Sequence, residues 1–326
     1  MKRSRRRGPY WRYGDTGRAQ RMDILLCCML LLIPQTLRFG MRPVLLTLAC
    51  AAIGVVTELL CCLLYRIEAA VSDLDSMVIG VLTAMLVPAN AGLYVPAMAI
   101  VFAVAVAKMP FGGSGRAPLH PVAAGMAFAT LCFPAQMFAY AALDAGKMDL
   151  NLLHSVQTKT VLSPAALLNS GARPTLLLTE LLTGEVVGPI GTTVAVVTAA
   201  AALYLIVRRT ISYYIPVCWV LAVAIVAMLW PRVITGRLDA ALMELLTGSL
   251  LFYGIFLASH TTAAPKLPVA QCAYGFAGGL IAMLFRYQGV FEQGGCFAVL
   301  LLNASAPVFD KLAWHVLYKK RGGVRL

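Results

Sequence analysis

Acidic residues are scarce in this chain of 326 residues, and charged residues of either sign are few. There are 14 Asp and Glu against 27 Lys and Arg, only 13% of the residues are charged, and 60% are hydrophobic. Soluble domains carry about 25% charged and about 45–50% apolar residues, so this chain lacks the polar groups that a water-exposed surface needs. The composition excludes a disordered chain, a collagen-like chain and a small secreted scaffold, and it predicts an integral membrane protein.

Several chemical motifs are missing as well. The nine cysteines form no Cys-x-x-Cys pair, and none neighbours a histidine at metal-ligand spacing. They are therefore predicted to be small hydrophobic residues in helix packing. The chain has no phosphate-binding Gly-Lys-Ser/Thr loop, no nicotinamide fingerprint and no iron–sulfur cysteine spacing. We expect no metal site and no complete active site in this chain alone, so any enzymatic role is that of one subunit of a translocase.

Part of the net charge of +13 lies in the basic N-terminal arm, which has eight Lys and Arg before Asp23. Such an arm beside a membrane span is predicted to face anionic lipid on the cytoplasmic side, and nucleic acid is not an expected partner. The apolar segment from Ile24 lacks the small-residue cleavage site of a signal peptide.

Ten apolar stretches predict an all-α membrane protein with about ten transmembrane helices. The stretches are 24–37, 43–64, 76–89, 92–107, 121–141, 190–207, 211–230, 245–258, 267–285 and 294–310. With ten spans both termini lie on one side, which then holds 19 of the Lys and Arg residues against 8 on the other. The positive-inside rule predicts that the termini are cytoplasmic and that the long connection 143–189 is external.

The long connection divides the chain into two halves of five spans each. Because five is odd, the halves enter the membrane with opposite topology, as in inverted-repeat transporters. The short third span of each half runs into an interrupted segment, at 88–92 and at 260–265, which predicts broken helices at the centre. The predicted organisation is a cytoplasmic arm (1–22), a first repeat (23–142), an external loop (143–189), a second repeat (190–310) and a cytoplasmic tail (311–326).

Three glycine-rich or proline-rich segments stand out. The segment 108–121 has three glycines within four positions, which permit a tight turn or a close backbone approach. The segment 188–193 begins the second half, and the segment 291–298 leads into the last span. Alone, the first segment predicts a tight cytoplasmic turn.

Taken together, these segments resemble the D-type subunit of the Rnf-type ion-translocating electron-transport complex and its relative, the B-type subunit of the sodium-pumping NADH:quinone oxidoreductase. The matching positions are Lys108, Phe111, Gly112, Gly113, Gly115, Pro118 and Pro121, then Gly188, Ile190, Gly191 and Thr193, then Arg208, Arg209, Ile211 and Pro216, and finally Gly294, Phe297, Ala298, Leu300, Asn303, Ala304, Pro307 and Asp310. The similarity runs in order from about residue 76 to 312.

The resemblance implies a flavin-holding subunit in a bacterial inner membrane, with the other integral and peripheral subunits of the complex and the lipid bilayer as partners. In the family an FMN is attached through its phosphate to a threonine in the external loop, and the corresponding hydroxyl here is Ser163. The resemblance also suggests cofactor contacts at Gly112, Gly113, Gly115 and His120.

The chain departs from the family at several positions that could touch the cofactor. Val161 and Leu162 stand where the family has Gly and Ala before the acceptor, and Ala117 and His120 replace two asparagines of the glycine-rich segment. We therefore predict a divergent member with little or no covalent FMN at Ser163, in which any flavin is held noncovalently as riboflavin or FMN.

Glu58 is the one acid well inside a predicted span. A buried ionisable group in lipid is costly and suggests an ion or proton path. The alternative is that Glu58 reaches an aqueous crevice near the cytoplasmic end of its span.

The leading functional hypothesis is a membrane subunit that couples flavin-mediated electron transfer to ion translocation. Two alternatives stay open: a non-redox transporter or channel on the same inverted repeat, and a structural subunit that has lost its covalent flavin. The sequence does not decide between Na⁺ and H⁺.

Overall fold

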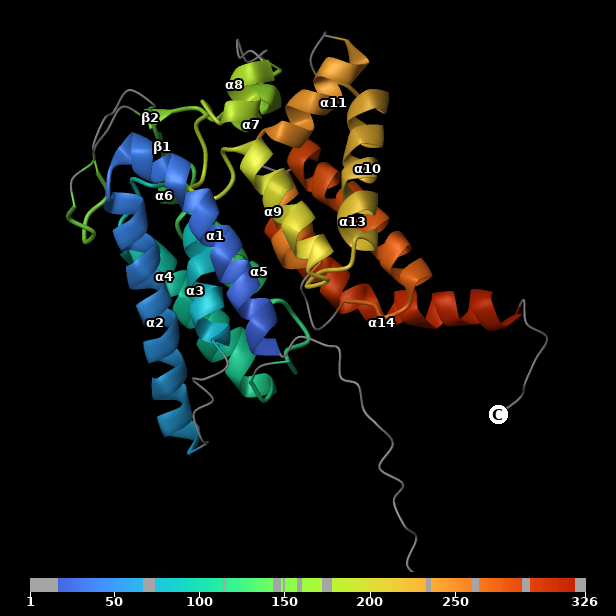
Figure 1. Cartoon of the computed structure of the whole chain (residues 1–326), viewed down its shortest axis with the longest axis horizontal. Helices are drawn as coiled ribbons and strands as arrows, with labels where there is room; N and C mark the ends of the chain where they lie inside the picture. Colours follow the sequence, from blue (N-terminus) through green and yellow to red (C-terminus); the bar gives the residue numbers. More distant parts are fainter. Residues whose placement is uncertain are drawn as a thin grey trace, which may run out of the picture.

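The computed structural model describes residues 17–66, 74–113, 115–142, 148, 150–156, 160–171, 178–232, 236–259, 264–288 and 294–319. Sequence predictions that concern 1–16, 114, 157–159, 260–263, 289–293 and 320–326 lie outside these residues. The described residues are mostly helical, which agrees with the predicted all-α class (Figure 1).

The first half of the chain contributes a group of helices joined by short connections. They are α1 (Gly17–Phe39), α2 (Arg42–Tyr65), α3 (Asp75–Met85), α4 (Tyr94–Phe102), α5 (Pro121–Cys132) and α6 (Pro134–Met137). α4 continues through a π-helical turn, Ala103–Lys108, and a 3₁₀ turn, Met109–Phe111. Proline occupies the first turn of α2 and of α5, where its missing N–H leaves no hydrogen bond unmade.

The connection between the halves contains short elements. β1 (Tyr140–Ala141) pairs with β2 (Thr160–Val161) in an antiparallel two-stranded sheet. α7 (Pro164–Asn169) and α8 (Leu178–Thr183) follow. In Figure 1 these elements lie together at the upper end of the molecule, opposite the lower end where α1 begins.

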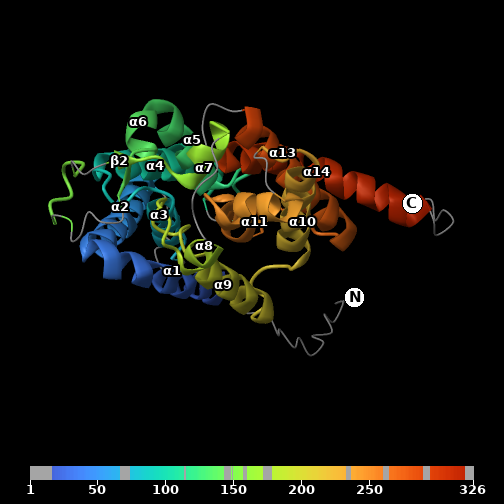
Figure 2. The same ribbon diagram turned by 90° about the horizontal axis from the view of Figure 1, so that it is seen from above.

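The second half forms another helical group. Its helices are α9 (Ala195–Val207), α10 (Tyr214–Leu229), α11 (Arg237–Leu246), α12 (Leu250–Phe252) with its π-helical continuation Tyr253–Ala258, α13 (Pro268–Gln288) and α14 (Gly295–Lys319). Seen from above, the two helix groups lie side by side (Figure 2). α1 packs against α9, and α5 packs against α14, so both contacts join the halves.

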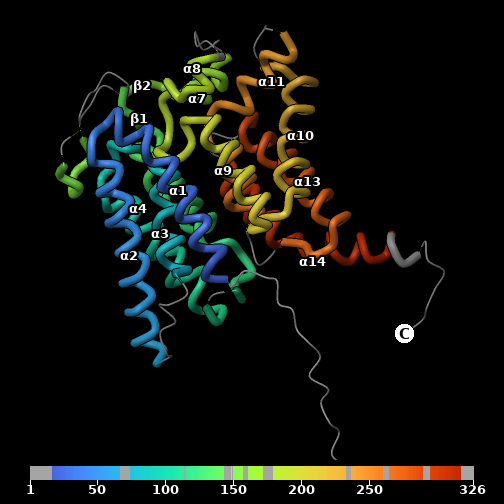
Figure 3. The backbone as a smooth tube through the Cα atoms, in the orientation of Figure 1, coloured from blue at the N-terminus to red at the C-terminus, as the bar shows by residue number. Residues whose placement is uncertain are grey.

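Among the described residues, five helices are long and apolar enough to cross a membrane: α1, α2, Tyr94–Phe111, α13 and α14. A sixth candidate is the pair of α11 and Leu250–Ala258, which is bent by 67°. The backbone trace in Figure 3 follows this bend. Four shorter apolar helices, α3, α5, α9 and α10, fall within the other predicted spans. The chain is thus a multi-pass helical protein.

Three predicted spans are interrupted or shortened. The predicted span 121–141 is not continuous, because α5 ends at Cys132 and Pro134 begins a separate turn. The predicted span 245–258 begins too late, since α11 already starts at Arg237 and the break falls at 247–249. The predicted span 190–207 is helical only from Ala195. In the predicted tail, residues 311–319 continue α14.

Close packing of α2 against α3 depends on two glycines. A methyl group added at Gly54 would lie 2.3 Å from the carbonyl oxygen of Ser76, and one added at Gly80 would lie 2.3 Å from the carbonyl oxygen of Cys50. Small residues let membrane helices approach closely, where dispersion forces rather than water exclusion drive association. This contact brings the start of α3 against the turn of α2 that carries Glu58.

Candidate functional site

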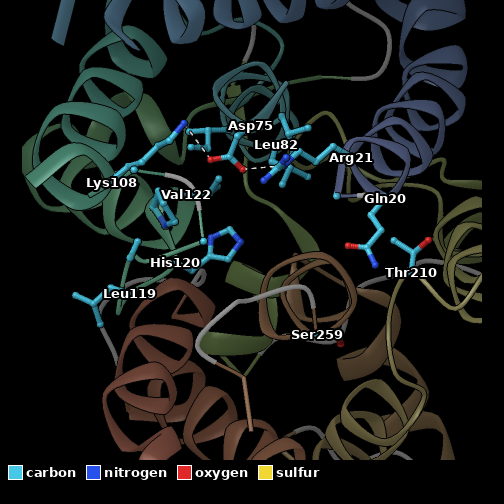
Figure 4. Close-up of a pocket in the computed structure, with 17 residues that line it drawn as sticks. Gln20, Arg21, Asp75, Leu82, Lys108, Leu119, His120, Val122, Thr210 and Ser259 are labelled. Atoms are coloured by element: carbon cyan, nitrogen blue, oxygen red, sulfur yellow. Dashed lines mark hydrogen bonds and ion pairs between the residues drawn. The ribbon is translucent and has the colours of Figure 1, made fainter. Parts of the chain in front are cut away.

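A cavity of about 280 Å³ opens at the lower end of the molecule, where both halves of the chain meet. It is lined by the start of α1, by α3, by the glycine-rich segment and the start of α5, and by Thr210 and Ser259 of the second half. Figure 4 shows Arg21, Asp75 and Lys108 along one edge and Gln20 and Thr210 along another. We call this space the inner cavity.

A network of four charged side chains, of which Lys108 and Glu58 are buried and Arg21 and Asp75 half-buried, borders the inner cavity. Lys108 Nζ lies 2.8 Å from Glu58 Oε1 and 3.0 Å from Asp75 Oδ2. Arg21 Nε in turn lies 3.1 Å from Asp75 Oδ1. Lys108 also donates to Ser76 Oγ at 2.8 Å. Charges alternate along the network, so each buried charge faces an opposite one.

Burial explains why Lys108 and Glu58 each have a partner of opposite charge. Lys108 is only 1% exposed and Glu58 only 7% exposed. An isolated charge at such a position would lose its hydration without gaining an ion pair or a hydrogen bond. Glu58 is therefore an ion-pair partner of Lys108, and its place in an ion path stays a prediction. The sequence indicated only a cytoplasmic turn at Lys108, so this ion pair was not predicted.

The three glycines of the glycine-rich segment all adopt left-handed backbone conformations. The φ angles are 95° at Gly112, 86° at Gly113 and 82° at Gly115. L-residues with a Cβ rarely adopt such angles, so the segment requires glycine for its shape. Gly113 and Gly115 line the inner cavity, and a methyl group added at either would meet nothing within 4 Å. Gly112 is not among the residues that line the cavity.

His120 is the residue before α5 and lines the inner cavity at 8% exposure. Figure 4 shows its imidazole ring directed toward the open centre of the cavity. The predicted residues Gly113, Gly115 and His120 are therefore brought together, with Glu58 behind Lys108.

A second buried acid ties α1 to the α9–α10 turn. Asp23 is 6% exposed and accepts hydrogen bonds from Thr210 Oγ1 at 3.0 Å and Tyr204 OH at 3.2 Å. Arg208 Nε lies 3.3 Å from Asp23 Oδ2. This role of Asp23 was not predicted, because Asp23 immediately precedes an apolar run and its position indicates the end of the basic arm.

At the upper end, two buried arginines hold interrupted helices. Arg42, which is fully buried, donates to the carbonyl oxygens of Ala89 at 3.0 Å and of Ala91 and His154 at 3.1 and 3.0 Å. Arg286, 1% exposed, donates to Thr247 Oγ1 at 2.7 Å. Each arginine therefore satisfies carbonyl or hydroxyl groups that a helix break leaves exposed.

One of the two interrupted segments predicted from the sequence, the break after α3, contacts the start of the second half. The break after α3 meets the segment 188–193: Gly191 N donates to Met85 O at 2.7 Å and Ile190 N donates to Val87 O at 3.2 Å. The segment 260–263, the predicted counterpart, lies outside the described residues. In the second half the described break is the one at 247–249.

Ser163 directly precedes α7, which lies at the upper end of the molecule, away from the lower end where the inner cavity opens (Figure 1). It is the N-cap of α7: its Oγ accepts from Ala166 N at 3.0 Å, and the residue is 4% exposed. The Ser163 hydroxyl is therefore buried and caps a helix, and little or no covalent FMN at this residue stays a prediction.

Metal-ligating side chains do not gather in the part of the chain that the structure describes. No group of three or more His, Cys, Asp and Glu residues there could hold an ion. Six of the cysteines are buried: Cys27, Cys28, Cys50, Cys61, Cys62 and Cys296.

Known proteins are similar to this chain over most of its length. The model of the NQR2, RnfD, RnfE family matches residues 4–319. The chain is 29% identical over 283 residues, covering 86% of this chain and 84% of the relative, to the D-type subunit of the Na⁺-translocating ferredoxin:NAD⁺ oxidoreductase complex of Acetobacterium woodii. It is 25% identical over 257 residues, covering 77% and 76%, to the D-type subunit of the proton-translocating ferredoxin:NAD⁺ oxidoreductase complex of Clostridium ljungdahlii.

A third relative comes from Vibrio cholerae. The D-type subunit of its ion-translocating oxidoreductase complex is 25% identical over 315 residues, which cover 88% of this chain and 90% of the relative. The resemblance seen in the sequence motifs is thus confirmed over nearly the whole chain. The chain belongs to the NQR2, RnfD, RnfE family.

Proposed function

We propose that this chain is the D-type membrane subunit of an ion-translocating electron-transport complex. The observation that carries the proposal is the family match over residues 4–319, together with relatives named as the D-type subunits of such complexes. The names of two relatives include ferredoxin and NAD⁺. Other subunits of the complex, which would bring electrons in and out, are the expected partners.

The proposed topology has ten membrane segments in two inverted repeats, with both termini in the cytoplasm of a bacterial cell. Five long helices, one bent pair and four shorter apolar helices supply ten segments among the described residues. Two arginines on the side with fewer basic residues, Arg38 and Arg232, contact the connection between the halves: Arg38 donates to Gly184 O and Arg232 donates to Asn169 Oδ1. Lys108 lies at the opposite end. This grouping agrees with the charge asymmetry of the sequence.

We further propose that the inner cavity holds a flavin noncovalently. A flavin ring presents carbonyl oxygens and ring nitrogens along one edge. The cavity offers donors in Gln20 and His120, and it offers the hydroxyl oxygens of Thr210 and Ser259 as acceptors, since their protons are donated to Asp23 and to Gly254 O. Its volume of about 280 Å³ suits a small planar group better than a whole dinucleotide. When bound, the flavin would supply one- and two-electron transfer.

The residues around the cavity have separate roles in this proposal. Gly112, Gly113 and Gly115 give this part of the chain a backbone shape that other residues rarely adopt, and Gly113 and Gly115 form part of the cavity wall. His120 and Ser259 orient the ring edge, and they come from opposite halves of the chain. Arg21 and Lys108 are balanced by Asp75 and Glu58, so the network adds no net charge to the cavity wall, which suits an uncharged flavin ring.

A binding titration tests the flavin proposal. Purified chain is titrated into riboflavin and into FMN while flavin fluorescence is followed. We expect saturable quenching, and we expect the His120→Leu variant to bind about tenfold more weakly because one hydrogen bond to the ring is lost. His315→Leu, on the exposed face of α14, is the matched control and should bind as the wild type does. Absence of saturable quenching, or equal binding by both variants, would contradict the proposal.

Copurification tests the role in a complex. The affinity-tagged chain, expressed at natural levels in its source organism, should bring down other membrane subunits with flavin and iron–sulfur absorption and with NAD⁺-reducing activity. An untagged strain is the control. A tagged chain that is recovered intact, but alone and without redox-active partners, would favour a non-redox transporter.

A further inference from the structure

The last helix leaves the body of the molecule. Figures 1 and 2 both show the C-terminal part of α14 running outward beyond the other helices, and in Figure 1 it lies crosswise to α2 and α10. Pro307 lies inside α14, and a proline inside a helix is a usual cause of a bend. The part of α14 after Pro307 therefore presents its faces to its surroundings rather than to the protein core.

Two rows of side chains run along this part of α14. Val308, Leu312 and Val316 recur at every fourth position, so they share one face, and all three are exposed. Lys311 and His315 are also four positions apart, and they form a neighbouring row that is exposed as well. An exposed apolar stripe beside a basic row is typical of a helix that lies in the interface between water and lipid.

A groove of about 540 Å³ lies between the basic row of α14 and the segment that leads into α13. The residues that line it are Lys266, Leu267, Asp310, Lys311, Trp314 and His315. Leu267, the indole ring of Trp314 and the hydrocarbon stems of the two lysines make its surface mostly apolar. We call this space the α14 groove.

Asp310 fixes the shape of the α14 groove. Its Oδ1 accepts hydrogen bonds from Lys266 N at 3.1 Å and from Leu267 N at 3.4 Å. These bonds tie α14 to the segment that precedes Pro268, the first residue of α13. The two walls of the groove are therefore held together by the protein itself, without any ligand.

The charges at the α14 groove favour an anion. Lys266 and Lys311 against Asp310 leave one net positive charge. Neither lysine forms an ion pair within the part of the chain that the structure describes, whereas Asp310 is engaged with two backbone N–H groups. The sequence adds three more positive charges at residues 319–321. Trp314 has the amphipathic ring that gathers at the level of lipid headgroups.

We propose that the α14 groove binds one anionic phospholipid, with its phosphate at Lys266 and Lys311 and its hydrocarbon against Leu267 and Trp314. A phospholipid matches both parts of the groove, because its phosphate is attracted to cations and its acyl chain needs an apolar wall. A lipid without net charge would gain nothing from the two lysines. The bound lipid would hold the last helix at the membrane surface, and its binding does not depend on electron transfer.

Quenching by brominated lipids tests the proposal, because bromine on an acyl chain quenches the fluorescence of tryptophans that it contacts. The full-length chain is reconstituted in phosphatidylcholine vesicles that contain increasing fractions of brominated phosphatidylglycerol or brominated phosphatidylcholine. We expect half-maximal quenching of Trp314 at a mole fraction about fivefold lower for phosphatidylglycerol, since one net charge near an anionic lipid corresponds to about that factor. Both leaflets carry the probe, so the result is independent of the orientation of the chain.

Three variants make the test specific. The difference between the wild type and Trp314→Phe isolates the Trp314 signal from the other three tryptophans. Lys266→Gln combined with Lys311→Gln removes two charges at exposed positions and should lower the preference for phosphatidylglycerol to about one or below. Arg66→Gln, the matched control, removes an exposed positive charge at the end of α2 and should keep the wild-type preference.

Equal quenching of the wild type by both lipids would show only an ordinary boundary lipid and would overturn the proposal. A double lysine variant that keeps the wild-type preference would overturn it too. Quenching of Trp314 by neither lipid would show that protein, such as a second copy of this chain, covers the groove. None of these outcomes decides the proposed function, which copurification of the complex tests separately.

Discussion

Replacing Lys108 by Met removes the one cation that, among the described residues, contacts both Glu58 and Asp75. Because Lys108 is 1% exposed, solvent does not screen the loss. Removing one member of a buried ion pair typically costs about 3–5 kcal/mol, since the other charge stays buried without its partner. Glu58→Gln is expected to cost less, about 1–2 kcal/mol, because Asp75 and Ser76 still hold the ammonium group.

The decisive comparison is the double variant. Glu58→Gln with Lys108→Met leaves no uncompensated acid at position 58, and Asp75 keeps Arg21 as a partner. We therefore expect the double variant to be more stable than Lys108→Met alone, with a coupling of about 1–3 kcal/mol.

Thermal melts followed by circular dichroism in detergent micelles measure these differences. Lys311→Met, at an exposed position of α14, is the control and should melt as the wild type does. The reasoning fails if Lys108→Met melts at the wild-type temperature. It also fails if the double variant is no more stable than Lys108→Met.

Three other substitutions have expected outcomes. Gly80→Leu places side-chain atoms against the carbonyl oxygen of Cys50 and should force α2 and α3 apart, lowering stability by about 3 kcal/mol or more in the same melts. Arg42→Met should expose the carbonyl groups of the break after α3 and make the connection between the halves cleavable at lower protease concentration. Ser163→Ala should lower the free energy of unfolding by about 1 kcal/mol, because the helix cap to Ala166 is lost. Intact-mass spectrometry should show no flavin adduct on either the wild type or the variant. A stoichiometric adduct on the wild-type serine would contradict our prediction.

The membrane class and the helical segments could be predicted from the sequence because each span is an apolar run. The ends of the helices were harder to predict. α1 begins at Gly17 rather than at residue 24 because Arg21 pairs with Asp75 and Asp23 pairs with Thr210. A hydropathy profile scores each residue alone. It therefore predicts that a helix ends at a charged residue even where a distant partner neutralises the charge.

The unusual backbone of the glycine-rich segment could be predicted from its residues, while the cofactor contacts there stay a prediction. The three glycines indicated an unusual backbone, and the structure places Gly113, Gly115 and His120 at one cavity. The ion pair between Glu58 and Lys108 could not be predicted, because the two residues are 50 positions apart and a single sequence gives no information on contacts between distant residues. A signal was nonetheless present: Lys108 ends an apolar helix, and Asp75 begins another.

The broken helices show the same limit. Pro88 and Pro189 mark interruptions that the sequence revealed, but the hydrogen bonds between the two segments depend on how the halves dock. Likewise, α5 ends before Pro134 as backbone sterics require, while the pairing of Tyr140 with Val161 is a tertiary contact.

Ion movement by proteoliposomes tests the central claim most directly. The purified complex, reconstituted with and without this chain, is given an electron donor and NAD⁺ on its cytoplasmic face, and Na⁺ and H⁺ movement is recorded with NADH formation. We predict that ions move only when electrons flow, and that vesicles lacking the chain move none. Ion movement at the complete rate without the chain, or ion flux through the chain alone without an electron donor, would contradict the account.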